Sequence, residues 1–156
     1  MELIKEHTID GITYSTDKGK LNIEYIHQFI SERSYWAVGI PRSLMERAIQ
    51  NSLCFGVYDQ QRQVGFARLV TDYATFGYLA DVFIDEAYRG RSLSKKLMEF
   101  IFSIEEISVF RRMILLTRDA HGLYQQYGFK PLASPDRYME VHRPDIYKTL
   151  SHDTVR

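Results

Sequence analysis

The stretch "YLADVFIDEAYRGRSLSKKLMEFI", residues 78–101, joins an alternating apolar run to a helical pattern through a short basic turn. The run "FGYLADVFI" (76–84) predicts a long strand in which Leu79, Asp81 and Phe83 share one face. Apolar residues then recur at three- and four-residue spacing, which predicts an amphipathic helix near 93–105. The turn and the first helical residues carry four basic side chains and no acid: Arg89, Arg91, Lys95 and Lys96.

A strand, a basic turn and a helix start together indicate an anion site. The N-terminus of a helix presents backbone N–H groups without partners and a partial positive charge. Gly90 lets the backbone approach a ligand closely, and Ser92 and Ser94 add hydroxyl donors. Converging donors suit a polyphosphate, although the residues alone leave open an ordinary solvated basic turn. The sequence contains neither GxxxxGK[ST] nor GxGxxG, which disfavours ordinary nucleoside triphosphate and dinucleotide binding.

The composition predicts one globular domain spanning 1–156. The 156 residues are 45% hydrophobic, and 20 basic residues balance 20 acidic ones. A zero net charge argues against nucleic acid or an anionic membrane as partner. The single cysteine, Cys54, allows no intrachain disulfide and suits a cytoplasmic location, and no uninterrupted apolar run reaches the ~18 residues of a spanning helix. The histidines and the cysteine lack metal-ligand spacing, so we expect no metal.

The remaining patterns complete an α+β fold. We expect an α/β/α sandwich: a mixed, mostly antiparallel six- to seven-stranded sheet with helices on both faces. The two central runs at 53–70 predict a hairpin, and the unit 76–117 predicts parallel strands joined by a helix. The expected strands lie at 11–16, 53–59, 63–70, 76–84, 112–117, 129–133 and 137–142. The expected helices lie near 21–32, after Pro41, near 93–105, and at 119–128 with Asp119 as N-cap and Gly128 as stop.

Two motifs carry a resemblance to a known family. "DVFIDEAYRGRSLSKKLMEFI" resembles the acetyl-coenzyme A signature of the GNAT superfamily of N-acyltransferases, a strand followed by Arg/Gln-x-x-Gly-x-Gly/Ala and a helix. "TRDAHGLYQQYGFKPL" resembles the family's Ala-x-x-Leu-Tyr-x-x-x-Gly-Phe element. The resemblance covers roughly 53–133 and implies an acyl-CoA N-acyltransferase-like fold. Ser92 and Ser94 stand at the two glycine positions, and serine tolerates fewer backbone conformations.

The resemblance implies acetyl-CoA as acyl donor and assigns residues to it. The strand end at 82–84 would splay from "RMILLT" and bond the pantetheine arm, while 89–94 would wrap the pyrophosphate. The residues that the resemblance assigns to the cofactor are Val82, Phe83, Ile84, Arg89, Gly90, Arg91, Ser92, Leu93, Ser94, Lys95, Thr117 and Tyr127.

Tyr124 and Asp81 are the candidate catalytic residues. Tyr124 lies where many members of the family have the tyrosine that protonates the departing thiolate. A tyrosine with a pKa of about 10 keeps its proton at neutral pH. Asp81 is a candidate proton acceptor, and its alternative is pairing with a nearby Arg or Lys. His121, one turn before Tyr124, is a second candidate, and a surface position is its alternative.

The predicted function is an N-acetyltransferase that moves an acetyl group from acetyl-CoA to a primary amine by direct attack on the thioester. The acceptor would be a small molecule or a peptide. The aromatic stretch "SYWAVGI" (34–40) lies where the family often borders its acceptor, and aromatic rings suit a cation. A non-catalytic acyl-CoA sensor or interaction module is the alternative, and the sequence leaves a homodimer open.

Overall fold

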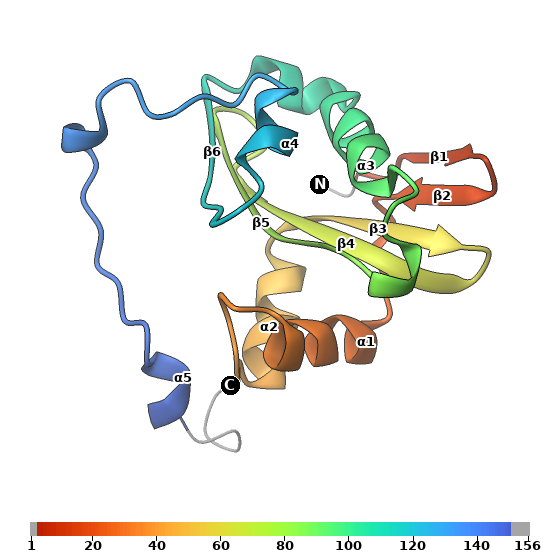
Figure 1. Cartoon of the computed structure of the whole chain (residues 1–156), viewed down its shortest axis with the longest axis horizontal. Helices are drawn as coiled ribbons and strands as arrows, with labels where there is room; N and C mark the ends of the chain where they lie inside the picture. Colours follow the sequence, from red (N-terminus) through yellow and green to blue (C-terminus); the bar gives the residue numbers. More distant parts are fainter. Residues whose placement is uncertain (1–2, 151–156) are drawn as a thin grey trace.

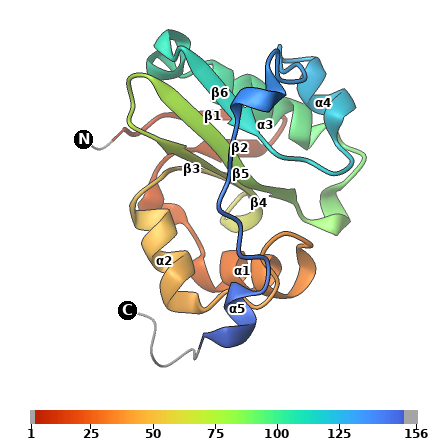
Figure 2. The same cartoon turned by 90° about the vertical axis from the view of Figure 1, so that its left-hand side faces the viewer.

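A computed structural model describes residues 3–150 and arranges them as one sheet between two helical layers (Figures 1 and 2). Neighbouring strands are antiparallel except β5 and β6, which are parallel. The sheet therefore confirms the predicted mixed, mostly antiparallel class with helices on both faces, and the parallel unit at 76–117. In their spatial order the strands are β1 (Glu6–Ile9), β2 (Ile12–Ser15), β3 (Leu53–Asp59), β4 (Arg62–Thr71), β5 (Phe76–Ile84) and β6 (Arg112–Leu115).

The helices cover the two faces through separate apolar clusters. On one face, α1 and α2 pack around Ile26, Met45 and Phe83, and on the other, α3 and α4 pack around Leu79 and Leu97 (Figure 2). Each such buried side chain contributes about 1.5–3 kcal/mol. The helices are α1 (Ile23–Gln28), extended by a π-helical turn (Phe29–Arg33), α2 (Arg42–Gln50), α3 (Leu93–Phe102), α4 (His121–Gln125) and α5 (Ile146–Thr149). No helix in the described chain is long and apolar enough to cross a bilayer.

The strand predicted at 11–16 is one half of a hairpin. β1 and β2 are joined by Asp10 and Gly11, whose φ values of 53° and 80° are those of a type I′ hairpin turn. Three of the four β1 residues are exposed, so this strand lacks the apolar alternation from which strands are recognised. The second hairpin, β3 and β4, forms as predicted.

The two strands predicted at 129–133 and 137–142 are wrong. These residues join no ladder and run as an extended, largely exposed arm past β6 towards α5 (Figure 1). The alternation of "RYMEVH" favours a strand, but a strand also needs a neighbouring backbone, and the described chain offers this segment none. The tail beyond 144 was expected to be poorly ordered or docked. Its described part docks through Tyr147 of α5 onto the α1–α2 cluster, and 151–156 lie outside the described residues.

A bulge breaks the alternation predicted for β5. Phe66 pairs with Phe83 and Arg68 with Ala80, so two β5 residues stand opposite one residue of β4. Asp81, at φ 53°, carries the distortion. Leu79 consequently packs under α3 whereas Phe83 packs under α1. The prediction that these two side chains share a face is therefore wrong.

The helix after the basic turn begins at Leu93 and ends at Phe102, three residues short of the predicted end. Gly90 (φ 81°) and Ser92 (φ 61°) both adopt left-handed backbone conformations before it. Glycine adopts this conformation without strain, whereas for other residues it costs about 1–2 kcal/mol. Ser92 is therefore a strained helix N-cap, and its side chain makes no capping hydrogen bond.

We expect Ser92→Gly to raise the free energy of unfolding by about 0.5–1 kcal/mol, because relief of the left-handed strain exceeds the extra chain entropy of glycine. Ser94→Gly is the matched control: it lies in the first turn of α3, where replacing serine by glycine should lower stability by up to about 0.5 kcal/mol. Urea denaturation of both variants measures the two values. Equal destabilisation by both would contradict the left-handed conformation of Ser92.

Candidate functional site

The site begins where β5 and β6 separate. The two strands pair only from Phe76–Leu79 to Arg112–Leu115, and beyond this point they diverge. The bulge at Asp81 bends β5 just past the last paired residue. The divergence opens a wedge, and along its β5 wall, Val82–Ile84, the edge that faces away from β4 has no strand partner in the described chain.

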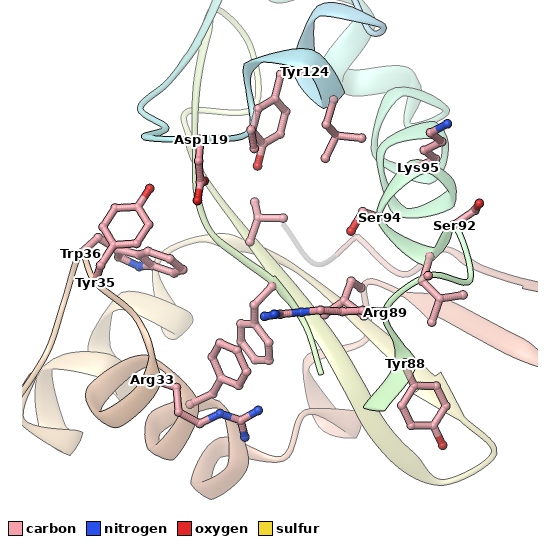
Figure 3. Close-up of a pocket in the computed structure, with 18 residues that line it drawn as sticks. Arg33, Tyr35, Trp36, Tyr88, Arg89, Ser92, Ser94, Lys95, Asp119 and Tyr124 are labelled. Carbon is pink, nitrogen blue, oxygen red and sulfur yellow. The ribbon is translucent and has the colours of Figure 1, made fainter. Parts of the chain in front are cut away.

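A cavity of about 580 Å³ occupies this wedge (Figure 3). Its volume lies within the ~300–1,000 Å³ of small-molecule sites. The walls come from β5, the basic turn, α3, α4, and the end of α1 with the loop that follows it. The predicted site residues that line the cavity are Val82, Phe83, Ile84, Arg89, Gly90, Ser92, Leu93, Ser94, Lys95 and Tyr124.

Hydrogen-bond donors concentrate at the α3 end of the cavity. The helix's first main-chain bond runs from the Lys96 N–H to the Ser92 carbonyl at 3.1 Å, so the preceding first-turn amides have no acceptor within the helix. In Figure 3 Arg89 reaches across the cavity and Ser94 points into it, whereas Ser92 and Lys95 point away. These amides, the helix dipole and the Arg89 guanidinium favour an anion here.

Tyr124 lies at the opposite end, on α4. Tyr124 is 8% exposed, and its hydroxyl points into the cavity (Figure 3). Burial raises the pKa of Tyr124 to about 12, with smaller contributions from Tyr35 and Asp119. The hydroxyl therefore keeps its proton well above neutral pH. Gly128 (φ 92°) terminates this segment as predicted, and the Phe129 N–H donates to the Tyr124 carbonyl at 3.3 Å.

Asp81 does not line the cavity. Its carboxylate accepts from Arg68 Nε at 2.7 Å and from Trp36 Nε1 at 2.8 Å. The Asp81 and Arg68 side chains are 7% and 17% exposed, so the ion pair is largely desolvated. This geometry favours the alternative given for Asp81, a structural ion pair, over the role of proton acceptor. The same carboxylate also holds Trp36. His121, the second candidate acceptor, is exposed and likewise does not line the cavity.

Thr117 does not line the cavity, but it contacts a residue that does. Its hydroxyl accepts from the N–H of Ala120, a lining residue, at 3.0 Å. Arg91, also outside the lining, places its guanidinium 5.1 Å from the centre of the Tyr88 ring.

Tyr127 turns away from the cavity. Its hydroxyl donates to the carbonyl oxygen of Lys95 at 2.9 Å, and its ring stacks on Phe102. This contact joins α3 to the segment after α4, so Tyr127 supports the helix whose first turn lines the cavity.

Asp119 is a site residue that the sequence reading placed wrongly. Helix α4 begins at His121, Ala120 precedes it, and the side chain that bonds the helix start is Thr117. The carboxylate of Asp119 is therefore free to face the cavity, near Tyr124 (Figure 3). The segment "TRDAHG" offers two side chains able to cap, and spacing alone could not choose between them.

The stretch "SYWAVGI" supplies an aromatic rim. Tyr35 and Trp36 line the cavity, are 46% and 42% exposed, and meet edge to face at 5.0 Å. The Arg118 guanidinium lies 3.9 Å from the Tyr35 ring centre, and the backbone N–H of Arg118 donates to the Tyr35 hydroxyl at 3.0 Å. Arg33, which no motif indicated, adds a cation to the same wall.

Comparisons with known proteins agree on one family. The sequence model of the Acetyltransferase (GNAT) domain matches residues 50–131. A candidate acetyltransferase of the GNAT family from Xanthomonas campestris pv. campestris has 45% identity and a TM-score of 0.88, with 91% of this chain and 100% of that chain covered. A candidate acetyltransferase from Gibberella zeae is 28% identical over 70% of this chain and 73% of its own length. A GNAT family acetyltransferase from Elizabethkingia anophelis, solved with acetyl-CoA bound, shares the fold at 15% identity and a TM-score of 0.60, over 85% of this chain and 88% of that chain.

Removing one partner of the buried Arg68–Asp81 ion pair should lower the stability of the fold strongly. Asp81→Ala should lower the free energy of unfolding by about 3 kcal/mol, because it leaves the Arg68 guanidinium desolvated and unpaired. Glu46→Ala, which removes the exposed Arg42–Glu46 pair at 2.9 Å, should cost less than about 1 kcal/mol. Urea denaturation of the two variants tests the contrast, and a similar loss in both would contradict a structural role for the buried pair.

Proposed function

This chain belongs to the GNAT family of acetyltransferases, and from that premise we propose that it transfers an acetyl group from acetyl-CoA to a primary amine of a small molecule or peptide. The observation that carries the proposal is the meeting, in one cavity, of the diverging β5 edge, the uncapped start of α3 and a protonated tyrosine. These three features suit an acyl arm, a pyrophosphate and a leaving thiolate respectively.

The α3 end would hold the phosphates of the donor. No side chain of the N-cap residue accepts from the first-turn amides, and Arg89 adds charge that a polyphosphate would neutralise. The peptide edge at Val82–Ile84 would extend hydrogen bonds to the amides of the pantetheine arm. Its N–H groups also supply donors for the carbonyl oxygen on which negative charge develops during acyl transfer.

The amine must reach the carbonyl carbon without its proton. A lysine-like amine has a pKa of about 10.4, so only about one molecule in a few thousand is neutral at pH 7. Asp119 is the carboxylate that lines the cavity, and we assign it to the ammonium group as its counter-charge and proton acceptor. Tyr35 and Trp36 would cover the same cation with their ring faces. Asp81 then acts as a positioning residue, through its hydrogen bond to Trp36.

Tyr124 would complete the reaction as general acid. As the amine nitrogen bonds to the acetyl carbon, the carbon–sulfur bond breaks and the sulfur takes the electron pair. The Tyr124 hydroxyl donates its proton to that sulfur, so coenzyme A leaves as a thiol, and the proton that the acetylated nitrogen then loses restores the Tyr124 phenol. A positioned acid of this kind contributes about 10²–10⁴-fold to the rate.

The experiment that tests the proposal is thiol release from acetyl-CoA in the presence of a panel of primary amines. Acceptor-dependent release, with acetylated amine found by mass spectrometry, is the expected result. Coenzyme A binding without any acceptor-dependent release would favour a non-catalytic acyl-CoA sensor instead. Absence of coenzyme A binding would overturn the donor site as well.

Tyr124→Phe should lower kcat by about 10²–10⁴-fold with little change in the Kd for coenzyme A, because only the proton donor is lost. Tyr127→Phe is the matched control, since the Tyr127 hydroxyl bonds the Lys95 carbonyl and Tyr127 does not line the cavity. Unchanged turnover in the Tyr124 variant would remove this residue from the acid role.

The pKa of Tyr124 also fixes the direction of the pH profile. Because the phenol keeps its proton up to a pKa of about 12, its acid form is fully present at neutral pH and would be lost only as pH rises through that value. We therefore expect turnover to rise between about pH 7 and about pH 10, as the amine loses its proton. A descending limb in this range that Tyr124→Phe abolishes would contradict the assignment.

Arg89→Ala should weaken coenzyme A binding by about tenfold or more, because a hydrogen bond to a charged group contributes about 1.5–3 kcal/mol. Binding of pantetheine, which has no phosphate, should change much less. Arg42→Ala, on α2 and outside the cavity lining, is the control. Calorimetry measures the Kd of each ligand for the wild type and for both variants. Equal losses of coenzyme A and pantetheine affinity in the Arg89 variant would argue against a phosphate-binding turn.

A further inference from the structure

Arg33 places a positive charge on the side of the cavity where the acceptor would lie. It ends the π-helical turn Phe29–Arg33 and lines the wall that faces α3 across the cavity (Figure 3). The other cations among the described lining residues, Arg89 and Lys95, belong to the basic turn and to α3, where the phosphates of the donor would bind. The proposed donor site therefore leaves the charge of Arg33 without a ligand.

A stack of planar side chains fixes the position of Arg33. Its guanidinium carbon lies 4.2 Å from the centre of the Phe29 ring, and that ring stacks on Phe83 of β5 at 3.8 Å. Phe29 and Arg33 are four residues apart, which brings their side chains to one face of a helix. All three side chains line the cavity. The guanidinium is thus held within two ring spacings of the β5 wall.

The guanidinium of Arg33 is only loosely paired. The Glu86 carboxylate lies 3.4 Å away, which exceeds the ~2.7–2.9 Å of a charge-assisted hydrogen bond. The two side chains are 37% and 63% exposed, and an ion pair so open to water adds little to stability. A carboxylate that binds both N–H groups of the arginine fork would therefore compete well with Glu86.

Asp119 places the opposite charge on the same side of the cavity. In Figure 3 the aromatic pair Tyr35 and Trp36 stands to one side, with Asp119 at its upper end and Arg33 below it. Hydrogen bonds of 3.0 and 2.8 Å hold the two rings in place. This side of the cavity therefore presents a carboxylate, an apolar surface and a guanidinium in that order.

We infer that the acceptor is an extended ω-amino carboxylate, a primary amine joined to a carboxylate by several methylene groups. The inference rests on the proposed acetyl transfer, because it names the acceptor of the same site. The ammonium group would pair with Asp119, the methylene groups would lie on Tyr35 and Trp36, and the carboxylate would bind Arg33. Arg33 would recognise the acceptor without taking part in proton transfer.

Two simpler classes of amine satisfy this arrangement less well. A plain alkylamine offers Arg33 no carboxylate. An α-amino acid carries its two charges on one carbon, so it cannot reach both Asp119 and Arg33, which lie at opposite ends of the aromatic pair (Figure 3). An ω-amino carboxylate supplies both charges and an apolar link between them.

The first test compares acceptors in steady-state acetyl transfer at saturating acetyl-CoA. The acceptors are ω-aminohexanoate, pentylamine, which is the same molecule without its carboxylate, and alanine. We expect kcat/KM for ω-aminohexanoate to exceed both other values by about tenfold or more, as for a hydrogen bond to a charged group. A pentylamine value equal to that of ω-aminohexanoate would overturn the inference and leave the proposed acetyl transfer standing. An equal value for alanine would overturn the extended class.

The second test separates recognition by Arg33 from a structural role. Arg33→Ala should raise KM for ω-aminohexanoate by about tenfold or more, with little change in kcat or in KM for pentylamine and acetyl-CoA. Glu86→Gln, which removes the competing carboxylate, should lower KM for ω-aminohexanoate. A purely structural ion pair predicts shifts in the same direction for both variants, and that result would overturn the inference. A raised KM for acetyl-CoA in Arg33→Ala would assign Arg33 to the donor and overturn it too.

The third test measures binding without turnover, by calorimetry on the full chain with coenzyme A present. ω-Aminohexanoate should bind the wild type, and Arg33→Ala should weaken that binding by about tenfold or more. Arg42→Ala, outside the cavity lining, is the control and should bind as the wild type does. Binding that depends on Arg33 without any acetyl transfer would refute the proposed function and retain the site for an ω-amino carboxylate. A wild type that does not bind ω-aminohexanoate at millimolar concentration would overturn the inference.

Discussion

The buried ion pair between Arg68 and Asp81 determines the shape of the site. Asp81 occupies a left-handed conformation, which costs about 1–3 kcal/mol in a residue other than glycine and persists only where the surroundings hold it. The Arg68 guanidinium on the neighbouring strand and the Trp36 indole on the opposite loop hold it here. Because the bulge follows the last residue of β5 that pairs with β6, the same contact bends the strand, opens the wedge and fixes the rim.

The cavity separates two kinds of electrostatic environment. The α3 end collects main-chain amides and Arg89, whereas the α4 end holds a neutral, desolvated tyrosine beside one carboxylate (Figure 3). The first environment favours a highly charged anion at the α3 end, and the second favours proton transfer at the α4 end. With a net charge of zero on the whole chain, the attraction for an anion is local to the helix start.

The C-terminal segment shows why a strand pattern does not by itself predict a strand in the same sheet. "RYMEVH" alternates as a strand should, yet it runs exposed beside an edge that it does not pair with. Alternation reports only the side-chain preferences of a segment, whereas a ladder also requires a second backbone within reach. In this chain Tyr147, beyond the far end of the segment, packs against the α1–α2 cluster on the other side of the sheet from α3 and α4.

The sequence by itself determined the strand–turn–helix unit, the parallel unit at 76–117, the hairpin of β3 and β4, and the family. The structural features rest on periodicity, glycine conformations and donor placement within short windows, where local physical chemistry dominates. The family rests on the resemblance of two motifs to known signatures. Only the tertiary structure decided the bulge at Asp81, because it depends on the register with Arg68, 13 residues earlier. It also decided that Thr117, and not Asp119, bonds the start of α4. The Asp119 carboxylate lines the cavity instead, because both side chains can cap a helix and their spacing in the sequence does not choose between them.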